Sequence, residues 1–208
     1  MLSDFAPVLF ALTVLATAVM AASAAIQAAR QSFDFFGAIV LALVTAVGGG
    51  TLRDLLIGRF PVFWISDPTY LATAVPVGLL TWLIACRIPA GGGRRLRLLL
   101  YLDAIGLALF TLIGLQIALN AGVSELMAVI LGCVTGIAGG MIRDVLCGLQ
   151  PSVLKEDLYA SISLAGGAAF IGLRDFATIE TALALSFAAM SLARFWVVWR
   201  GSIRDEPL

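Results

Sequence analysis

The sequence predicts an all-α integral membrane protein: one membrane domain of seven transmembrane helices, built as two inverted three-helix repeats plus a seventh helix. Composition, a series of uncharged runs and a motif that recurs 90 residues later all predict this fold. Of the 208 residues, 61% are hydrophobic and only 12% are charged, and the mean hydropathy is +1.05. About a quarter of the residues in a soluble domain are charged. A water-facing fold of this size cannot hide so much apolar surface, so the composition indicates a bilayer.

Seven uncharged runs supply the predicted spans, because a helix needs about 20 mostly apolar residues to cross a bilayer. They are residues 5–26, 35–52, 68–86, 104–124, 126–142, 158–173 and 181–193. The seventh run continues through Arg194 to Trp199. We expect this arginine to extend along the helix toward the membrane surface.

The positions of Lys and Arg predict the orientation, because short cytoplasmic loops have an excess of positive charge. The loop at 87–97 contains four arginines and is therefore placed in the cytoplasm. Ten of the 13 Lys and Arg residues then fall inside, and Arg53, Arg59 and Arg174 fall outside. The N-terminus is expected outside and the C-terminus in the cytoplasm.

An internal repeat organises the chain. The segment GGTLRDLLIG at 49–58 recurs as GGMIRDVLCG at 139–148, with six of ten positions identical. A three-span unit starts and ends on opposite sides of the membrane, so two units in tandem have opposite topology. The predicted organisation within 1–208 is repeat one at about 5–88, a linker at 89–97, repeat two at about 98–175 and the seventh helix at about 178–200.

Glycine clusters lie deep in the second and fifth predicted spans, at Gly48, Gly49 and Gly50 and at Gly139 and Gly140. Consecutive glycines weaken a helix and permit a kink or an unwound turn. Unwound backbone at membrane depth is tolerated only against protein or a water-filled cavity. We therefore expect a permeation path between two glycine-broken helices. Exposed carbonyl groups and negative helix ends there would suit a cation, and positive helix ends would suit an anion or a carboxylate.

An Arg-Asp pair follows each glycine cluster: Arg53 with Asp54, and Arg143 with Asp144. Charged residues at membrane depth usually face the bundle interior and pair with one another. Two interpretations stay open, because such a pair either braces its helix or lines and gates a pathway. Asp103, at the start of the fourth span, lies either in the pathway entrance or only at the membrane surface.

Two threonines precede the glycine clusters, Thr45 in the first copy and Thr135 in the second. Their hydroxyl groups either face a permeating ion or bond back to their own helix, and the sequence favours neither.

Several classes of function are excluded by what the sequence lacks. It contains no histidine, the commonest general base and metal ligand. It shows no nucleophile triad, nucleotide fingerprint or metal-ligand cluster, so we expect no enzyme activity, no cofactor and no resident metal. Its net charge of zero argues against a nucleic-acid partner.

Four stretches are similar to one known family. VTAVGGGTLRD at 44–54 followed by PVFW at 61–64 resembles the first repeat of the prokaryotic trimeric intracellular cation (TRIC) channel family. DAIGLALF at 103–110 and GGMIRDVL at 139–146 resemble its second repeat. The resemblance implies a homotrimer in a prokaryotic plasma (inner) membrane, in contact with lipids, in which each subunit has its own pore for the monovalent cations potassium and sodium.

The residues and the resemblance together give a set of candidate pore or gate positions: Thr45, Gly48, Gly49, Gly50, Arg53, Asp54, Asp103, Thr135, Gly139, Gly140, Arg143 and Asp144. A second hypothesis is a secondary transporter of a small zwitterion such as glycine, since arginine pairs with a carboxylate and aspartate with an ammonium group. A membrane scaffold that transports nothing is the third hypothesis.

Overall fold

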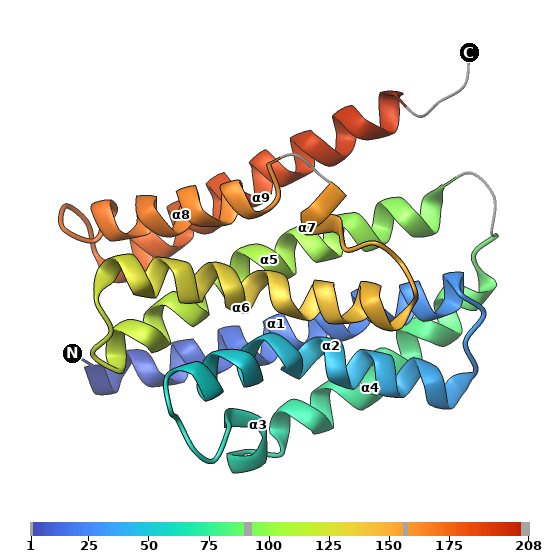
Figure 1. The fold of residues 1–208 in the computed structure, drawn as a ribbon, viewed down its shortest axis with the longest axis horizontal. Helices are drawn as coiled ribbons and strands as arrows, with labels where there is room; N and C mark the ends of the chain where they lie inside the picture. Colours follow the sequence, from blue (N-terminus) through green and yellow to red (C-terminus); the bar gives the residue numbers. More distant parts are fainter. Residues whose placement is uncertain (1, 90–92, 156–157, 205–208) are drawn as a thin grey trace.

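The computed structural model describes residues 2–89, 93–155 and 158–204, which form helices joined by turns and loops (Figure 1). The long helices are α1 (Leu2–Arg30), α2 (Phe35–Leu56), α4 (Thr69–Arg87), α5 (Arg94–Asn120), α6 (Glu125–Leu146) and α9 (Ile179–Arg204). The shorter helices are α3 (Phe63–Ser66), α7 (Ser152–Lys155) and α8 (Ala160–Leu173). Residues 90–92 of the predicted linker lie outside the described residues.

Six of the described helices are long and apolar enough to cross a membrane, so the all-helical membrane fold is confirmed. The count of seven spans is not, because the helix that matches the sixth predicted span, α8, has only 14 residues. At 1.5 Å per residue, α8 is about 21 Å long, against a hydrocarbon thickness of about 30 Å.

Four of the long helices form the centre of the molecule. Helix α1 packs against α2 and α5, and α6 packs against the same two helices from the other side. Helix α4 covers α1 and α2, whereas α8 and α9 cover α6 and α5 (Figure 1). Helix α1 begins at the end of the bundle where α3 lies, and α9 ends at the opposite end (Figure 1).

Helices α2 and α6 end in the same way. Gly58 and Gly148 follow them in left-handed conformation, with φ of +69° and +67°. The backbone carbonyl groups of Asp54 and Asp144 accept hydrogen bonds of 2.8 and 2.9 Å from the residue after each glycine. A left-handed glycine closes the last helical turn without a steric penalty. Each Arg-Asp pair therefore lies in the last two turns of its helix.

The glycine clusters do not break the helices. Both α2 and α6, which match the second and fifth predicted spans, are α-helical throughout, so neither contains the unwound turn that the glycines could permit. The glycines instead let two backbones touch. A Cβ on Gly139 would lie 2.6 Å from the carbonyl oxygen of Thr45, and one on Gly49 would overlap the carbonyl oxygen of Thr135. Small residues permit this close approach in membranes, and the helices stay wound because a neighbouring backbone fills the missing side-chain space.

Large apolar side chains cover the outside of the bundle. Phe36 is 66% exposed, Leu15 53% and Leu192 67%. Patches of this kind on a soluble monomer would mark an interface. On a bundle of long apolar helices, exposed side chains of this kind are typical of a membrane protein.

Substitution at the backbone contact provides a test. We expect Gly139→Ala to lower stability by about 1–3 kcal/mol, because the added methyl group meets rigid backbone rather than a side chain that can move. Gly172→Ala in α8 is the matched control, since a Cβ there has nothing within 4 Å. Thermal unfolding of the detergent-purified variants measures both effects. If Gly139→Ala and Gly172→Ala had the same melting temperature, the close crossing of α2 and α6 would be contradicted.

Candidate functional site

The two Arg-Asp pairs lie at opposite ends of the central bundle, because α2 and α6 run in opposite directions (Figure 1). All four side chains are buried: Arg53 and Arg143 are each 1% exposed, Asp54 0% and Asp144 5%. Burying an ion is costly unless a partner of opposite charge and further hydrogen bonds compensate for lost water. The surroundings of each pair therefore decide what it can do.

In the first pair, one carboxylate serves both the arginine and the following loop. Arg53 donates from Nε and Nη2 to Asp54 Oδ1, at 2.9 and 2.8 Å. Asp54 Oδ2 accepts the backbone N–H of Phe63 at 2.8 Å, which fixes the start of α3. The guanidinium carbon of Arg53 lies 5.6 Å from the centre of the Phe63 ring. The pair thus holds α3 against the end of α2.

The second pair repeats this arrangement. Arg143 Nε donates to Asp144 Oδ1 at 2.9 Å, and Nη2 lies 2.9 Å from the same oxygen. Asp144 Oδ2 accepts from the backbone N–H of Ser152, which begins α7, at 3.1 Å. In each copy the aspartate fixes the short helix that follows, which agrees with the bracing interpretation.

Arg143 also has partners that Arg53 lacks. Its Nη1 donates to Asp103 Oδ1 on α5 and to Ser23 Oγ on α1, both at 2.7 Å. The hydroxyl group of Tyr159 donates to Asp103 Oδ2 at 2.5 Å. Asp103 is 1% exposed and Tyr159 is 3% exposed, so both are buried between helices. Side chains from α1, α5 and α6, together with Tyr159 just before α8, therefore meet in one hydrogen-bonded network at this end of the bundle.

Helix α9 adds a further positive charge to this network. Arg194 is completely buried, and its guanidinium carbon lies 4.4 Å from the centre of the Tyr159 ring. The expectation that Arg194 extends to the membrane surface is wrong. The aromatic face of Tyr159 offsets part of the cost of burying this charge, as in cation–π contacts generally. Tyr159 and Arg194 were not candidates in the sequence, although a charge within an apolar run was the signal for Arg194.

The first copy has no counterpart of Asp103. Ninety residues before Asp103 stands Thr13, whose hydroxyl group donates to the carbonyl of Leu9 at 2.7 Å. Within the described residues, Arg53 Nη1 is buried and has no hydrogen-bond partner. The two halves of the molecule therefore differ in charge around the arginine.

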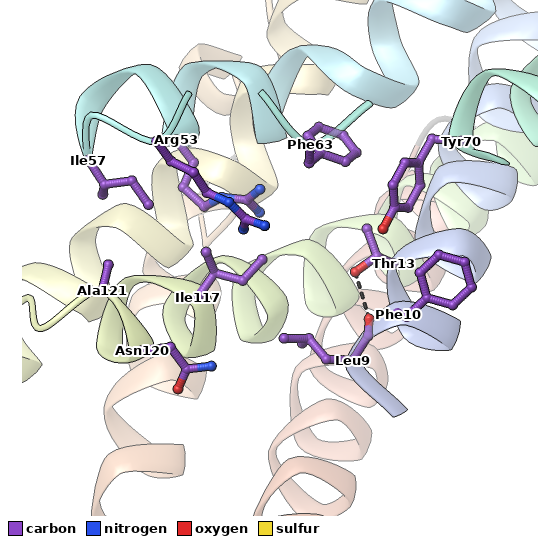
Figure 2. A pocket seen from close by; sticks show the side chains of 11 residues that line it. Leu9, Phe10, Thr13, Arg53, Ile57, Phe63, Tyr70, Ile117, Asn120 and Ala121 are labelled. Carbon is purple, nitrogen blue, oxygen red and sulfur yellow. Dashed lines mark hydrogen bonds between the residues drawn. The ribbon is translucent and has the colours of Figure 1, made fainter. Parts of the chain in front are cut away.

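A cavity of about 500 Å³ opens beside Arg53 (Figure 2). It lies at the end of the bundle where α1 begins and α5 ends. Its lining is Leu9, Phe10, Thr13, Arg53, Ile57, Arg59, Phe63, Tyr70, Ile117, Asn120 and Ala121. Figure 2 shows the guanidinium group of Arg53 and the hydroxyl group of Tyr70 directed into this space. Tyr70 and Asn120 are not among the candidates from the sequence, because neither belongs to the repeated motif.

The threonines of the candidate set lie at the helix crossing rather than in the cavity. Thr135 Oγ1 donates to the carbonyl of Leu131 at 2.6 Å, so it bonds back to its own helix. Thr45 Oγ1 is buried and has no partner among the described residues. Both residues present their backbone carbonyl groups to a glycine of the opposite helix.

The remaining candidate glycines admit neighbouring side chains. A Cβ on Gly48 would meet the side chain of Ile142 at 2.7 Å, and one on Gly50 would meet the Phe63 ring at 2.5 Å. A Cβ on Gly140 would lie 3.1 Å from Asp103 Oδ1. These positions are therefore close-packing sites around the Arg-Asp pairs. Among the residues that the structure describes, no group of three or more Cys, Asp or Glu side chains is placed to hold a metal ion.

Comparison with known proteins gives consistent relatives. Residues 10–85 and 100–175 match a family model described as "Glycine transporter". The chain is 44% identical to the inner membrane protein YadS of Escherichia coli over 158 residues, which are 75% of this chain and 74% of that protein. It is 38% identical to the membrane protein YvgT of Bacillus subtilis over 167 residues, 75% of this chain and 76% of that one.

Solved structures of channels have the same fold. The TRIC trimeric intracellular cation channel orthologue from Rhodobacter sphaeroides superposes with a TM-score of 0.87 at 38% identity, over 93% of this chain and 98% of that one. A structure described in a study of conductance through TRIC cation channels gives a TM-score of 0.75 at 30% identity, over 91% and 92% of the two chains.

The unequal surroundings of the two arginines predict unequal effects of neutralising a carboxylate. We expect Asp54→Asn to cost about 3–5 kcal/mol of stability, because it removes the one carboxylate that pairs with Arg53. Asp103→Asn should cost less, because Arg143 keeps Asp144. Thermal unfolding in detergent measures both variants. A larger loss in Asp103→Asn would contradict this ranking.

Proposed function

Because the chain belongs to the prokaryotic TRIC channel family, we propose that it is a channel for monovalent cations, potassium and sodium, in a prokaryotic inner membrane. The observation that carries the proposal is the similarity to the Rhodobacter sphaeroides channel orthologue, at 38% identity over nearly the whole of both chains. The same similarity supports a protein that is not an enzyme. By analogy with the trimeric relative, we include self-association as a homotrimer. The distribution of Lys and Arg along the chain supports an N-terminus outside.

We place the pore along the axis enclosed by α1, α2, α5 and α6, within each subunit. The cavity beside Arg53 is its outer mouth, and the Arg143 network is its inner end. This differs from a path between α2 and α6 themselves, because those helices touch at Gly49 and Gly139. Met20 lies at the middle of the axis, with its sulfur against Gly106 and its methyl group 3.3 Å from where a Cβ on Gly139 would lie.

The two arginines do not exclude cations in this arrangement, because each is paired with carboxylate. Arg53 has Asp54, and Arg143 has both Asp144 and Asp103. An ion pair in a low-dielectric interior is much stronger than in water. We propose that the Arg143 network closes the inner end, and that conduction requires the guanidinium group to leave Asp103.

The family model's description favours a second candidate, a transporter of glycine. Arg53 offers a partner for a carboxylate group at the cavity. The ammonium group of glycine would also need an acceptor, but the cavity lining contains no Asp or Glu among the described residues. The channel is therefore the function that the geometry supports better.

Electrical recording from the purified protein in planar bilayers tests the proposal. Under a potassium chloride gradient, we expect the reversal potential to shift from zero toward the equilibrium potential of potassium. A sodium chloride gradient should give the corresponding shift toward the equilibrium potential of sodium. Bilayers without protein are the control. Uptake of radiolabelled glycine into liposomes that contain the purified protein distinguishes the alternative. Saturable uptake without cation current would contradict the channel and support the transporter.

Chemical modification tests the position of the outer mouth. In a protein whose native cysteines are replaced, we expect Thr13→Cys to lose current when a positively charged thiol reagent is added on the N-terminal side. Leu15→Cys is the matched control, because Leu15 lies two residues further along α1 and is 53% exposed on the apolar outer surface. Equal loss in both variants, or none in Thr13→Cys, would overturn this placement.

A further inference from the structure

The cavity beside Arg53 has the composition of an anion site. We propose that it binds one small monovalent anion, a halide or a carboxylate, through Arg53. The proposal concerns binding and goes beyond the proposed conduction of cations, so each can fail without the other.

The first observation is the unused donor. Arg53 is 1% exposed, and its Nε and Nη2 are occupied by Asp54, but Nη1 has no partner in the described residues. A buried charged donor left unsatisfied costs more than a typical hydrogen bond contributes. Figure 2 shows this guanidinium group at the wall of the cavity. Because Nη1 itself is buried, an acceptor in the cavity would satisfy it once the guanidinium group turns toward that space.

The second observation is the chemistry of the rest of the lining. Arg59 adds a second positive charge, and the lining contains no Asp or Glu among the described residues. Asn120 Oδ1 accepts from Gln116 Nε2 at 3.0 Å, which leaves the amide N–H groups of Asn120 as donors. The hydroxyl group of Tyr70 is directed into the same space (Figure 2). Donors without a carboxylate select a negative ligand.

The third observation comes from the other copy of the motif. There the equivalent nitrogen, Arg143 Nη1, is bound by Asp103 Oδ1 at 2.7 Å. The residue 90 positions before Asp103 is Thr13, which lines the cavity. An anion bound at Arg53 would therefore supply the negative charge that Asp103 supplies in the second copy.

The size of the cavity agrees with a small ligand. Its volume of about 500 Å³ admits a hydrated halide or the carboxylate of a short organic acid. For comparison, one water molecule occupies about 30 Å³ in the liquid. With the anion in place, Arg53 would have two negative partners, as Arg143 has in Asp144 and Asp103.

The test is ligand-dependent thermal stability of the full-length protein in detergent. Unfolding is followed at constant ionic strength in sodium chloride, bromide or formate, with sodium gluconate as the reference anion. We expect a melting temperature that rises and saturates with the concentration of the binding anion. A rise with chloride and bromide alone identifies a halide site, and a rise with formate alone identifies a carboxylate site.

Variants assign the effect to the cavity. Thr13→Asp provides the missing carboxylate, so we expect it to fold and to lose the anion-dependent rise. Thr13→Val is the matched control, because it removes the hydroxyl group without adding charge and should keep the rise. Bromide soaked into crystals should give anomalous scattering beside Arg53 Nη1 if the site takes halides.

The proposal is overturned if none of the anions raises the melting temperature above that in gluconate. It is also overturned if Thr13→Asp and the unmodified protein respond alike, or if Thr13→Asp does not fold and Arg53→Gln keeps the response. None of these results depends on cation current.

Discussion

The backbone contact between α2 and α6 is the constraint on which the rest of the structure depends. Gly49 and Gly139 let the two helices touch at the carbonyl groups of Thr135 and Thr45. Each arginine lies four residues, about one turn, beyond its glycine. Because the helices run in opposite directions, this single crossing places one buried Arg-Asp pair toward each end of the bundle.

The two ends of the bundle differ in the charged side chains that surround the arginine. Both pairs use their aspartate in the same way, to fix the backbone of α3 or α7. Only the second copy adds Asp103, Tyr159 and the buried Arg194, and this set fills its end of the bundle. The first copy has Thr13 instead and keeps a cavity. Arg53 is paired with Asp54 alone and keeps one nitrogen, Nη1, without a partner among the described residues, whereas Arg143 has both Asp144 and Asp103.

Much of the fold was predictable because the bilayer limits the choices. Uncharged runs of sufficient length predicted the long helices, and the repeated motif predicted two similar helix ends. The prediction of an unwound turn at the glycines failed, because packing against neighbouring elements outweighs the low helix propensity of glycine. Gly48, Gly49 and Gly50 weaken an isolated helix, but α2 stays wound because α6 and Phe63 occupy the space beside them. A sequence does not state which neighbour a glycine faces.

The candidate site shows the same division. The sequence by itself determined that the solvent is lipid, that Arg53-Asp54 and Arg143-Asp144 form a repeated feature, and that the family is one of membrane channels. Only the tertiary structure decided that Asp103 and Tyr159 join Arg143, while Tyr70 and Asn120 face Arg53 across a cavity. The reason is physical: side chains that meet in this bundle come from helices far apart in sequence. Their pairing depends on where the helices cross, and that position was set by a contact between backbone atoms.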